Sequence, residues 1–176
     1  MRYHFSDAEI KAALKTMVVV VDSREQENEH ITRYFNAKGI PWITAKLDVG
    51  DYSARVPSCD EMGLSRGLDF SSSIVVERKG SLDELAGNLT KDRTRFEDEL
   101  LRARWTKVAL LVEDATYGDI VNGKYRSKYN AKSFVATLAA YSARFNLDVS
   151  FVERPFSGNW IYHRLYYAVR EALLRG

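Results

Sequence analysis

Apolar runs and polar segments alternate along most of this chain, and their periods predict its main elements. The four consecutive valines at residues 18–21 are too few for a helix and are all β-branched, so they predict a strand buried on both faces. Other short apolar or alternating runs predict further strands, at residues 42–47, 52–56, 74–76, 107–112 and 148–152. Capping and turn signals place helices between them, at residues 7–17, 23–39, 81–88, 92–104, 131–145 and 160–174.

Several of these elements carry clear signals at their ends. Ser6 and Glu9 form a capping box, in which a hydroxyl and a carboxylate accept from the free N–H groups of a first helical turn. The same pattern recurs at residues 23–26, and Gly39 can close the helix that it opens. Residues 57–70, with their glycines, proline and polar side chains, predict an exposed loop. The order of elements predicts an α/β protein with a mixed sheet and helices on both faces.

Length and composition indicate one ordinary globular domain. The chain has 176 residues, which we divide into an N-terminal helical extension at residues 1–17 and a main domain at residues 18–176. A hydrophobic fraction of 45% and a charged fraction of 28% exclude disordered and collagen-like classes. The single cysteine, Cys59, excludes an intrachain disulfide. A net charge of +2 does not by itself indicate nucleic acid.

No signal for a membrane or for secretion is present in these residues. The longest apolar run is far shorter than the roughly 20 residues that span a bilayer. The first ten residues carry charges throughout and lack the apolar core of a signal peptide. We therefore expect no membrane partner and a cytoplasmic location, or a nuclear one if the source is a eukaryote.

Three acids, Asp22, Asp51 and Glu77, fall at the ends of predicted strands. Strand ends in an open α/β sheet converge on one crevice, where carboxylates would repel one another unless a cation joined them. Their oxygens suit Mg²⁺ or Mn²⁺. In an extended segment, Glu77 and Lys79 project together while Arg78 points away. A carboxylate for a metal beside an ammonium that can orient a water is a hydrolytic arrangement.

The residues around these acids resemble the motifs of a known family. The string GDY at residues 50–52 and the string VERKGSLD at residues 76–83 resemble the GDY and ERKxxxD motifs of the XPF family of structure-specific DNA endonucleases. The string DSRE at residues 22–25 is similar to a D-x-R-E segment that this family carries upstream. The resemblance implies a restriction-endonuclease-like fold of the PD-(D/E)XK superfamily, a three-layer α/β/α arrangement with a central mixed sheet.

The resemblance also implies an activity, namely metal-dependent hydrolysis of phosphodiester bonds in branched or structured DNA such as flaps, forks or junctions. Asp51 and Glu77 would bind the divalent metal, Mg²⁺ or Mn²⁺. Lys79 would orient or activate the attacking water, and Arg78 would support the site or contact a phosphate.

Three further acids, Asp22, Glu25 and Asp83, would lie around the same metal ion or a second one on this resemblance. Each of them also has a structural alternative. Asp22 could merely end its strand, and Glu25 lies in an expected first helical turn. Asp83 lies within a capping box at residues 81–84, where the helix dipole stabilises an acid.

A basic segment at residues 124–132 has four cationic residues, two tyrosines and no acid. Its cations could grip phosphates while a tyrosine ring stacks on an unpaired base. On this interpretation the DNA-binding residues are Lys124, Tyr125, Arg126, Lys128 and Lys132. The alternative is a solvated loop with surface tyrosines. The charged residues at 93–104 alternate in sign and favour a solvent-exposed helix face.

The helix expected at residues 160–174 is rich in aromatic residues, and nuclease domains of the resembled family pair through their C-terminal helices, so we expect a homodimer. Family members usually add a helix-hairpin-helix module, and none follows here, so a dimer or a separate DNA-binding partner would supply affinity. Three other interpretations stay open: a catalytically silent DNA-binding relative, a nuclease of the same superfold acting on another nucleic acid, and an assembly subunit that acts through the aromatic helix.

Overall fold

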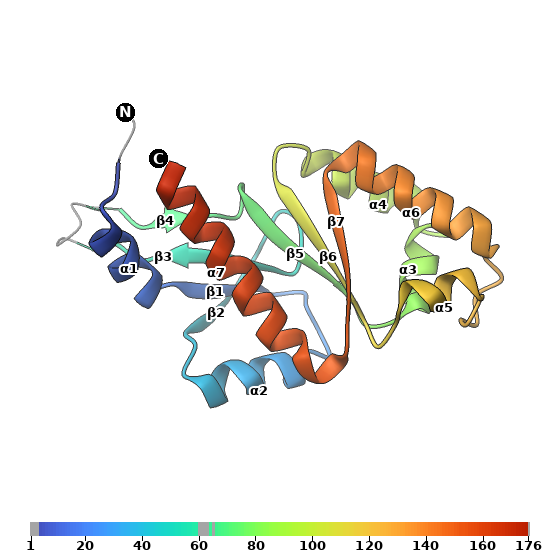
Figure 1. The fold of residues 1–176 in the computed structure, drawn as a ribbon, viewed down its shortest axis with the longest axis horizontal. Helices are drawn as coiled ribbons and strands as arrows, with labels where there is room; N and C mark the ends of the chain where they lie inside the picture. Colours follow the sequence, from blue (N-terminus) through green and yellow to red (C-terminus); the bar gives the residue numbers. More distant parts are fainter. Residues whose placement is uncertain (1–3, 60–63, 65, 176) are drawn as a thin grey trace.

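A computed structural model describes residues 4–59, 64 and 66–175, which fold around one seven-stranded sheet (Figure 1). The strands follow the order β2-β1-β3-β5-β6-β7, with β4 paired to β3. Their bounds are β1 Val18–Asp22, β2 Trp42–Ala45, β3 Tyr52–Val56, β4 Leu68–Asp69, β5 Ile74–Lys79, β6 Lys107–Glu113 and β7 Leu147–Val152. β1 and β2 are parallel, as are β5, β6 and β7, whereas β3 is antiparallel to its neighbours. The predicted mixed sheet is confirmed.

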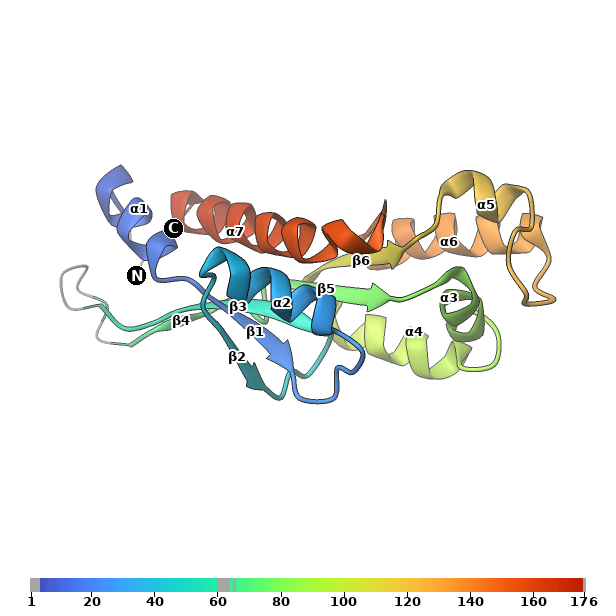
Figure 2. The ribbon, with the colours of Figure 1, turned by 90° about the horizontal axis from the view of Figure 1, so that it is seen from below.

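Helices cover both faces of the sheet and complete the three layers (Figures 1 and 2). One face carries α1 Asp7–Lys15, α2 Glu29–Lys38 and α7 Ser157–Arg175. The other face carries α3 Leu82–Asn88, α4 Arg93–Arg102, α5 Tyr117–Val121 and α6 Ala131–Phe145. A 3-10 turn, η2 Arg154–Phe156, precedes α7. The expected three-layer α/β/α fold is therefore present.

Strand alternation divides the interior into two cores. In β6, Ala109 and Leu111 face α1, α2 and α7, which we call the first core. Val108 and Leu110 face α3–α6, which we call the second core. Because successive residues of a strand point to opposite faces, whether a strand position is odd or even decides which helices its side chain meets.

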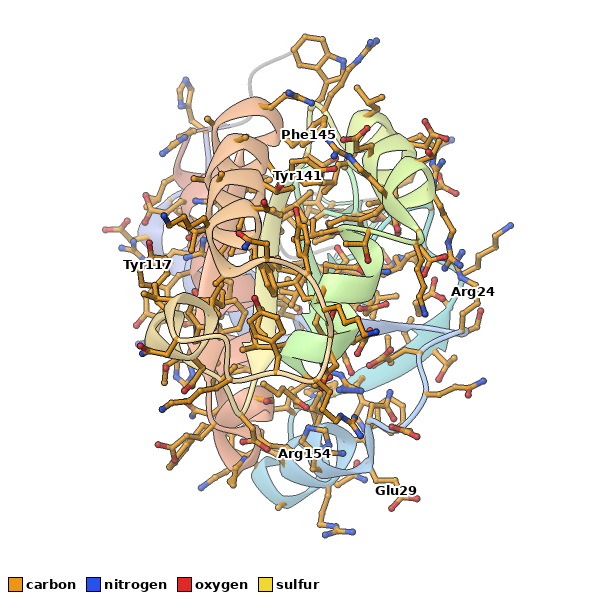
Figure 3. All side chains as sticks on the ribbon, turned by 90° about the vertical axis from the view of Figure 1, so that its right-hand side faces the viewer. Arg24, Glu29, Tyr117, Tyr141, Phe145 and Arg154 are labelled. Atoms are coloured by element: carbon orange, nitrogen blue, oxygen red, sulfur yellow. The ribbon has the colours of Figure 1, made fainter. Side chains whose placement is uncertain are left out.

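The second core is closed by aromatic packing between α6 and α4. Figure 3 shows Tyr141 and Phe145 between these two helices. The ring centroids of Tyr141 and Phe96 lie 6.3 Å apart, and those of Tyr141 and Phe145 lie 5.4 Å apart in an edge-on arrangement. Offset and edge-on contacts are the geometries that aromatic rings prefer. These contacts fix α4 over the end of the sheet where the acidic residues gather.

Several predicted boundaries are correct and several are not. The Ser6–Glu9 capping box opens α1, and Gly39, at a φ of 63°, closes α2. The helix expected from residue 23 begins only at Glu29, because residues 23–28 form a loop that is bonded to the sheet. The strand expected at 74–76 continues through Lys79. The patterns did not predict the short elements α5 and β4.

Two expectations fall partly outside the described residues. Of the loop expected at residues 57–70, residues 60–63 and 65 lie outside them. The expected extension at residues 1–17 is described from residue 4, and its helix α1 packs into the first core through Ile10, Ala13 and Leu14. None of the described helices is both long and apolar enough to cross a membrane.

We expect Leu165→Ala to lower the free energy of unfolding by about 3 kcal/mol, because Leu165 of α7 is fully buried in the first core. Leu174→Ala is the matched control, since Leu174 lies on the same helix and is 42% exposed, and should cost less than about 1 kcal/mol. Urea unfolding measures both values. Equal losses would contradict the packing of α7 described here.

Candidate active site

One end of the sheet collects the acids that the sequence singles out. Asp22 ends β1, Asp51 directly precedes β3, and Glu77 lies near the end of β5. Because β3 runs antiparallel between β1 and β5, its start lies beside the ends of both. Backbone hydrogen bonds fix this junction: Asp22 N–H donates to the Asp51 carbonyl at 2.7 Å, and Asp51 N–H donates to the Val76 carbonyl at 2.8 Å.

Strand alternation turns Asp22, Asp51, Glu77 and Lys79 toward the same face of the sheet, the face of α3 and α4. The strand neighbours Val21, Tyr52 and Val76 point into the first core instead. The four side chains line a polar cleft between the strand ends and these two helices. The sequence prediction that Glu77 and Lys79 project together, away from Arg78, is confirmed by their contact.

Gly50 permits the close approach of β3 to β5 at this cleft. Its φ is 74°, a conformation that residues with a Cβ rarely adopt. A Cβ at this position would lie 2.8 Å from Val75 Cβ and 3.2 Å from the Val76 carbonyl oxygen. The glycine of the GDY string therefore sets the position of the aspartate that follows it.

The two central carboxylates are buried and incompletely compensated. Burial, with the charges of Glu77 and Glu25, raises the pKa of Asp51 well above its usual value, although Arg78 N–H donates to Asp51 Oδ2 at 2.7 Å. Burial also raises the pKa of Glu77, despite the Lys79 ammonium 2.7 Å from its Oε1. A raised carboxyl pKa means that the surroundings disfavour the negative charge. The cleft would therefore attract a cation.

Lys79 is held as an ammonium group inside this cleft. Burial alone would lower the pKa of Lys79, but the nearby Glu77 carboxylate raises it above its usual value. The Nζ atom also lies 3.7 Å from Glu84 Oε1 and 5.5 Å from the centroid of the Phe96 ring. Lys79 is therefore protonated at neutral pH, so that it can donate hydrogen bonds but cannot accept a proton.

The residues of the cleft fit a magnesium-type cation. Among the described residues, no group of three or more His, Cys, Asp and Glu side chains is arranged as a metal centre. Mg²⁺ does not require one, because it keeps several waters and is commonly bound through one or two carboxylates and a substrate phosphate. Asp51 and Glu77 supply two carboxylates. Asn88 Oδ1, in the lining of the same cleft, is buried without a hydrogen-bond partner in the described structure and is free to accept from a coordinated water.

Asp22 lies in the cleft wall, but both its oxygens are already engaged. Oδ1 accepts from the N–H and from Nε of Arg24, both at 2.8 Å, and Oδ2 accepts from Leu47 N–H at 2.6 Å. Burial raises the pKa of Asp22, but these bonds from Arg24 and Leu47 lower it below its usual value. Figure 3, which looks onto this end of the molecule, shows Arg24 at one edge. The contacts support the structural alternative for Asp22.

Arg78 lies on the opposite face of β5, where a buried ionic network supports the site. Its Nε donates to Glu25 Oε1 at 2.7 Å, and its Nη1 donates to Glu113 Oε2 at 3.1 Å. Glu113 is fully buried, and its other oxygen lies 2.7 Å from His30 Nε2. Glu25 Oε1 also accepts from Tyr52 OH. Of the two roles expected for Arg78, these contacts favour support of the site.

The structure does not bring Asp83 into the cleft. Its Oδ1 accepts from the backbone N–H groups of Arg126 at 2.8 Å and Ser127 at 2.9 Å, and its Oδ2 accepts from Arg126 Nε at 3.1 Å. The cap of α3 is Ser81, whose hydroxyl accepts from Glu84 N–H at 3.2 Å. Asp83 therefore faces the basic segment, away from Asp51 and Glu77.

The basic segment keeps its cations on the surface and packs its half-buried tyrosines against the second core. The exposed cations are Lys124, Arg126, Lys128 and Lys132. The Tyr125 ring packs edge-on against Phe134 at 5.3 Å, and its hydroxyl donates to the Tyr129 carbonyl. Because the Tyr125 ring is committed to the second core, these contacts do not favour the stacking on bases expected from the sequence.

The sequence missed the contribution of α4 to the cleft. Arg95, Phe96 and Glu99 line it, whereas the pattern predicted a solvent face for the charged residues of this helix. The pair Arg93–Glu97, at 3.1 Å, does lie on such a face. Arg95 and Glu99 are four residues apart on either side of the buried Phe96, and this helical period was the available signal.

Comparisons with known proteins identify the family of the chain and relatives of its fold. The ERCC4 domain model matches residues 21–163, so the chain belongs to the ERCC4 domain family, and the predicted kinship with XPF nuclease domains is confirmed. XPF from Aeropyrum pernix shares the fold, with a TM-score of 0.61 and 24% identity over 88% of this chain and 63% of that chain. XPF from Aeropyrum pernix in complex with DNA also has a TM-score of 0.61, with 21% identity over 88% of this chain and 66% of that chain. The chain thus spans slightly less than two thirds of these structures. No curated protein matches the sequence.

We expect Arg78→Ala to lower the free energy of unfolding by about 3–5 kcal/mol, because Glu113 would be left buried without its guanidinium partner. Arg55→Ala is the matched control. The Arg55–Asp69 pair has the same chemistry at 2.8 Å but is exposed, and its loss should cost about 0–1 kcal/mol. Chemical denaturation compares the two variants, and similar losses would contradict the stabilising role of the buried network.

Proposed function

We propose that this chain is an endonuclease that hydrolyses phosphodiester bonds in branched or structured DNA, such as flaps, forks and junctions, with Mg²⁺ or Mn²⁺ as cofactor. The observation that carries the proposal is the meeting of Asp51, Glu77 and Lys79 in one cleft, with both carboxyl pKa values raised. Membership of the ERCC4 family, and a fold relative solved in complex with DNA, support DNA as the partner.

The cleft residues would have distinct roles in hydrolysis. A divalent ion held by Asp51 and Glu77 would polarise the phosphoryl group and lower the pKa of a bound water. Lys79, as a buried cation, donates to the water or to a phosphoryl oxygen and stabilises the negative charge that develops in the transition state. Glu77 Oε1 holds the Lys79 ammonium in place. With its ammonium held by Glu77, Lys79 would orient the attacking water and stabilise the developing negative charge.

We expect Lys79→Ala to lower the rate of cleavage at saturating DNA by about 100-fold or more, because the transition state loses a preorganised cation. Glu77→Ala should abolish cleavage. The measurement uses labelled flap, fork, four-way-junction and linear duplex DNA, each with Mg²⁺, with Mn²⁺ and with EDTA. Lys38→Ala is the matched control, because Lys38 is an exposed lysine in the last turn of α2, which covers the opposite face of the sheet from the cleft.

Each outcome of this experiment has a defined meaning. Metal-dependent cutting near a branch point, lost in Glu77→Ala and retained in Lys38→Ala, supports the proposal and ranks the substrates. DNA binding without cleavage of any substrate would favour a catalytically silent relative. Cleavage confined to RNA would favour a nuclease of the same fold with another substrate. An unchanged rate in Lys79→Ala would remove that residue from the mechanism.

We also propose that two copies of the chain pair through α7. A groove along this helix is lined by Trp160, His163 and Tyr167, and Tyr167 is 56% exposed. The His163 and Tyr167 rings are stacked with their centroids 6.4 Å apart, so they form one continuous aromatic surface. Aromatic surfaces of this kind are enriched at protein interfaces, and a twofold axis would bring the same patch of both copies together.

Multi-angle light scattering at micromolar concentration should give a dimer, and Tyr167→Arg should shift it toward the monomer because the charge would be buried at the interface. Tyr117→Arg is the matched control, since Tyr117 of α5 is equally exposed, at 55%, and lies outside this groove. A monomeric wild-type protein would overturn the proposed pairing.

A further inference from the structure

Residues 124–129 form what we call the basic strap, in which alternate side chains face the protein and the solvent. The inward side chains are half-buried: Tyr125, Ser127 and Tyr129. The outward side chains are exposed and all basic: Lys124, Arg126 and Lys128. This two-residue alternation is that of an extended chain, although the strap pairs with no strand among the described residues. Every cation of the strap is thus accessible to a ligand in solution.

Aromatic packing fixes the strap in this position. The Tyr125 and Tyr129 rings lie 5.3 and 5.4 Å from the Phe134 ring of α6, between centroids. The Tyr129 hydroxyl lies 2.7 Å from Thr137 Oγ1. Asn130, directly after the strap, caps α6 by accepting from Ser133 N–H. The strap is therefore anchored at its C-terminal end before any ligand binds, which reduces the entropy that binding would cost.

Asp83, in the first turn of α3, supplies the second anchor. One of its oxygens accepts two backbone N–H groups, those of Arg126 and Ser127, and the other accepts the Arg126 side chain. Burial raises the pKa of Asp83, but the bonds from Ser127 and Arg126 lower it below its usual value, so the carboxylate is charged at neutral pH. Because two of these donors are backbone N–H groups, their bonds to Asp83 fix the path of the strap and do not depend on the side chains of Arg126 and Ser127.

The first turn of α3, which carries Asp83, also lines the cleft. Glu84, the next residue, lines the cleft, and its Oε1 lies 3.7 Å from Lys79 Nζ. Its other oxygen accepts from Gly80 N–H at 2.9 Å. Figures 1 and 2 both place α3 and the segment between α5 and α6 at the same end of the molecule. The strap is thus tied to the wall of the cleft through two consecutive residues.

We infer that Asp83 is a positioning residue, which fastens the basic strap beside the cleft so that Lys124, Arg126 and Lys128 bind the phosphate backbone of the DNA leading into the site. The inference rests on the proposed function and names a surface that guides its substrate. The exposed ion pairs of Arg126 with Asp83 and of Lys124 with Asp119 do not prevent it, because exposed pairs are weak and phosphates can compete for the cations. Lys128 has no ion-pair partner among the described residues.

The test separates DNA binding from metal binding and from turnover. Binding of a labelled fork is measured by fluorescence anisotropy in EDTA at several salt concentrations, and cleavage is measured at saturating DNA over a range of Mg²⁺. We expect Asp83→Ala to weaken DNA binding about tenfold. The number of counterions released on binding, given by the slope of affinity against salt concentration, should fall by about one to two. Turnover at saturating DNA and the Mg²⁺ concentration for half-maximal cleavage should stay within about twofold. Asp83→Asn, which keeps an oxygen acceptor for the backbone N–H groups, should retain most of the affinity.

A double-mutant cycle tests whether Asp83 acts through the strap. Lys128→Ala should weaken DNA binding on its own, and Asp83→Ala combined with Lys128→Ala should lose less affinity than the sum of the two single losses. Lys38→Ala, an exposed lysine on the far face of the sheet, is the charge-matched control and should leave binding unchanged. Thermal unfolding of each variant confirms that it is folded.

Three outcomes would overturn the inference. They are unchanged DNA binding in Asp83→Ala, additive losses in the cycle, and an Asp83→Ala variant that needs about ten times more Mg²⁺ while binding DNA normally, which would identify a metal ligand. A wild-type protein that binds DNA but cuts no substrate would refute the proposed nuclease activity alone. The binding measurements would still decide the role of the strap.

Discussion

The buried ion pairs of Arg78 are the constraint on which the site depends. The Arg78 guanidinium joins Glu25 and Glu113, and it also donates to the carbonyls of Gln26 and Glu27. One side chain thus connects β5, the end of β6 and the loop after β1. A charge buried this deeply is tolerated only when its partners are close and its hydrogen bonds are complete, so the geometry around Arg78 has little freedom.

The two faces of β5 differ in how completely their charged side chains are paired. On the face of Arg78, carboxylates and cations are paired. On the face of Glu77, two buried carboxylates share one ammonium, that of Lys79, and the pKa values of both carboxyl groups are raised. A folded state that raises a carboxyl pKa loses stability as the pH rises toward that value, because the unfolded chain ionises more readily. The paired face offsets this cost, and a bound cation would remove it.

The sequence predicts the parts of the site that depend on local structure, and it does not predict those that depend on distant contacts. The alternation of Glu77, Arg78 and Lys79 is a local property of an extended chain, so their directions followed from the sequence. The capping pattern at residues 23–26 failed because the competing interactions are distant: Arg78 binds carbonyls that lie 51 and 52 residues earlier. The basic neighbours of Tyr125 predict a DNA contact, whereas the position of its ring depends on Phe134, in a helix whose bounds the sequence predicts but whose orientation it does not.

Strand alternation along β5 also gives the ERKxxxD string a physical meaning. Its glutamate and lysine line the cleft because they share one face of β5, and its arginine holds the opposite face. Gly80 and Ser81 then turn the strand into α3, where a Cβ on Gly80 would lie only 3.2 Å from Arg78 Nη1. The chain has changed from strand to helix before it reaches Asp83, so the last residue of the string no longer follows the alternation that aims Glu77 at the cleft. Its carboxylate instead meets the backbone of the strap. The spacing of the motif therefore directs its side chains to three places: the cleft, the opposite face of β5 and the basic strap. The aspartate at its last position accepts hydrogen bonds from the backbone of the strap.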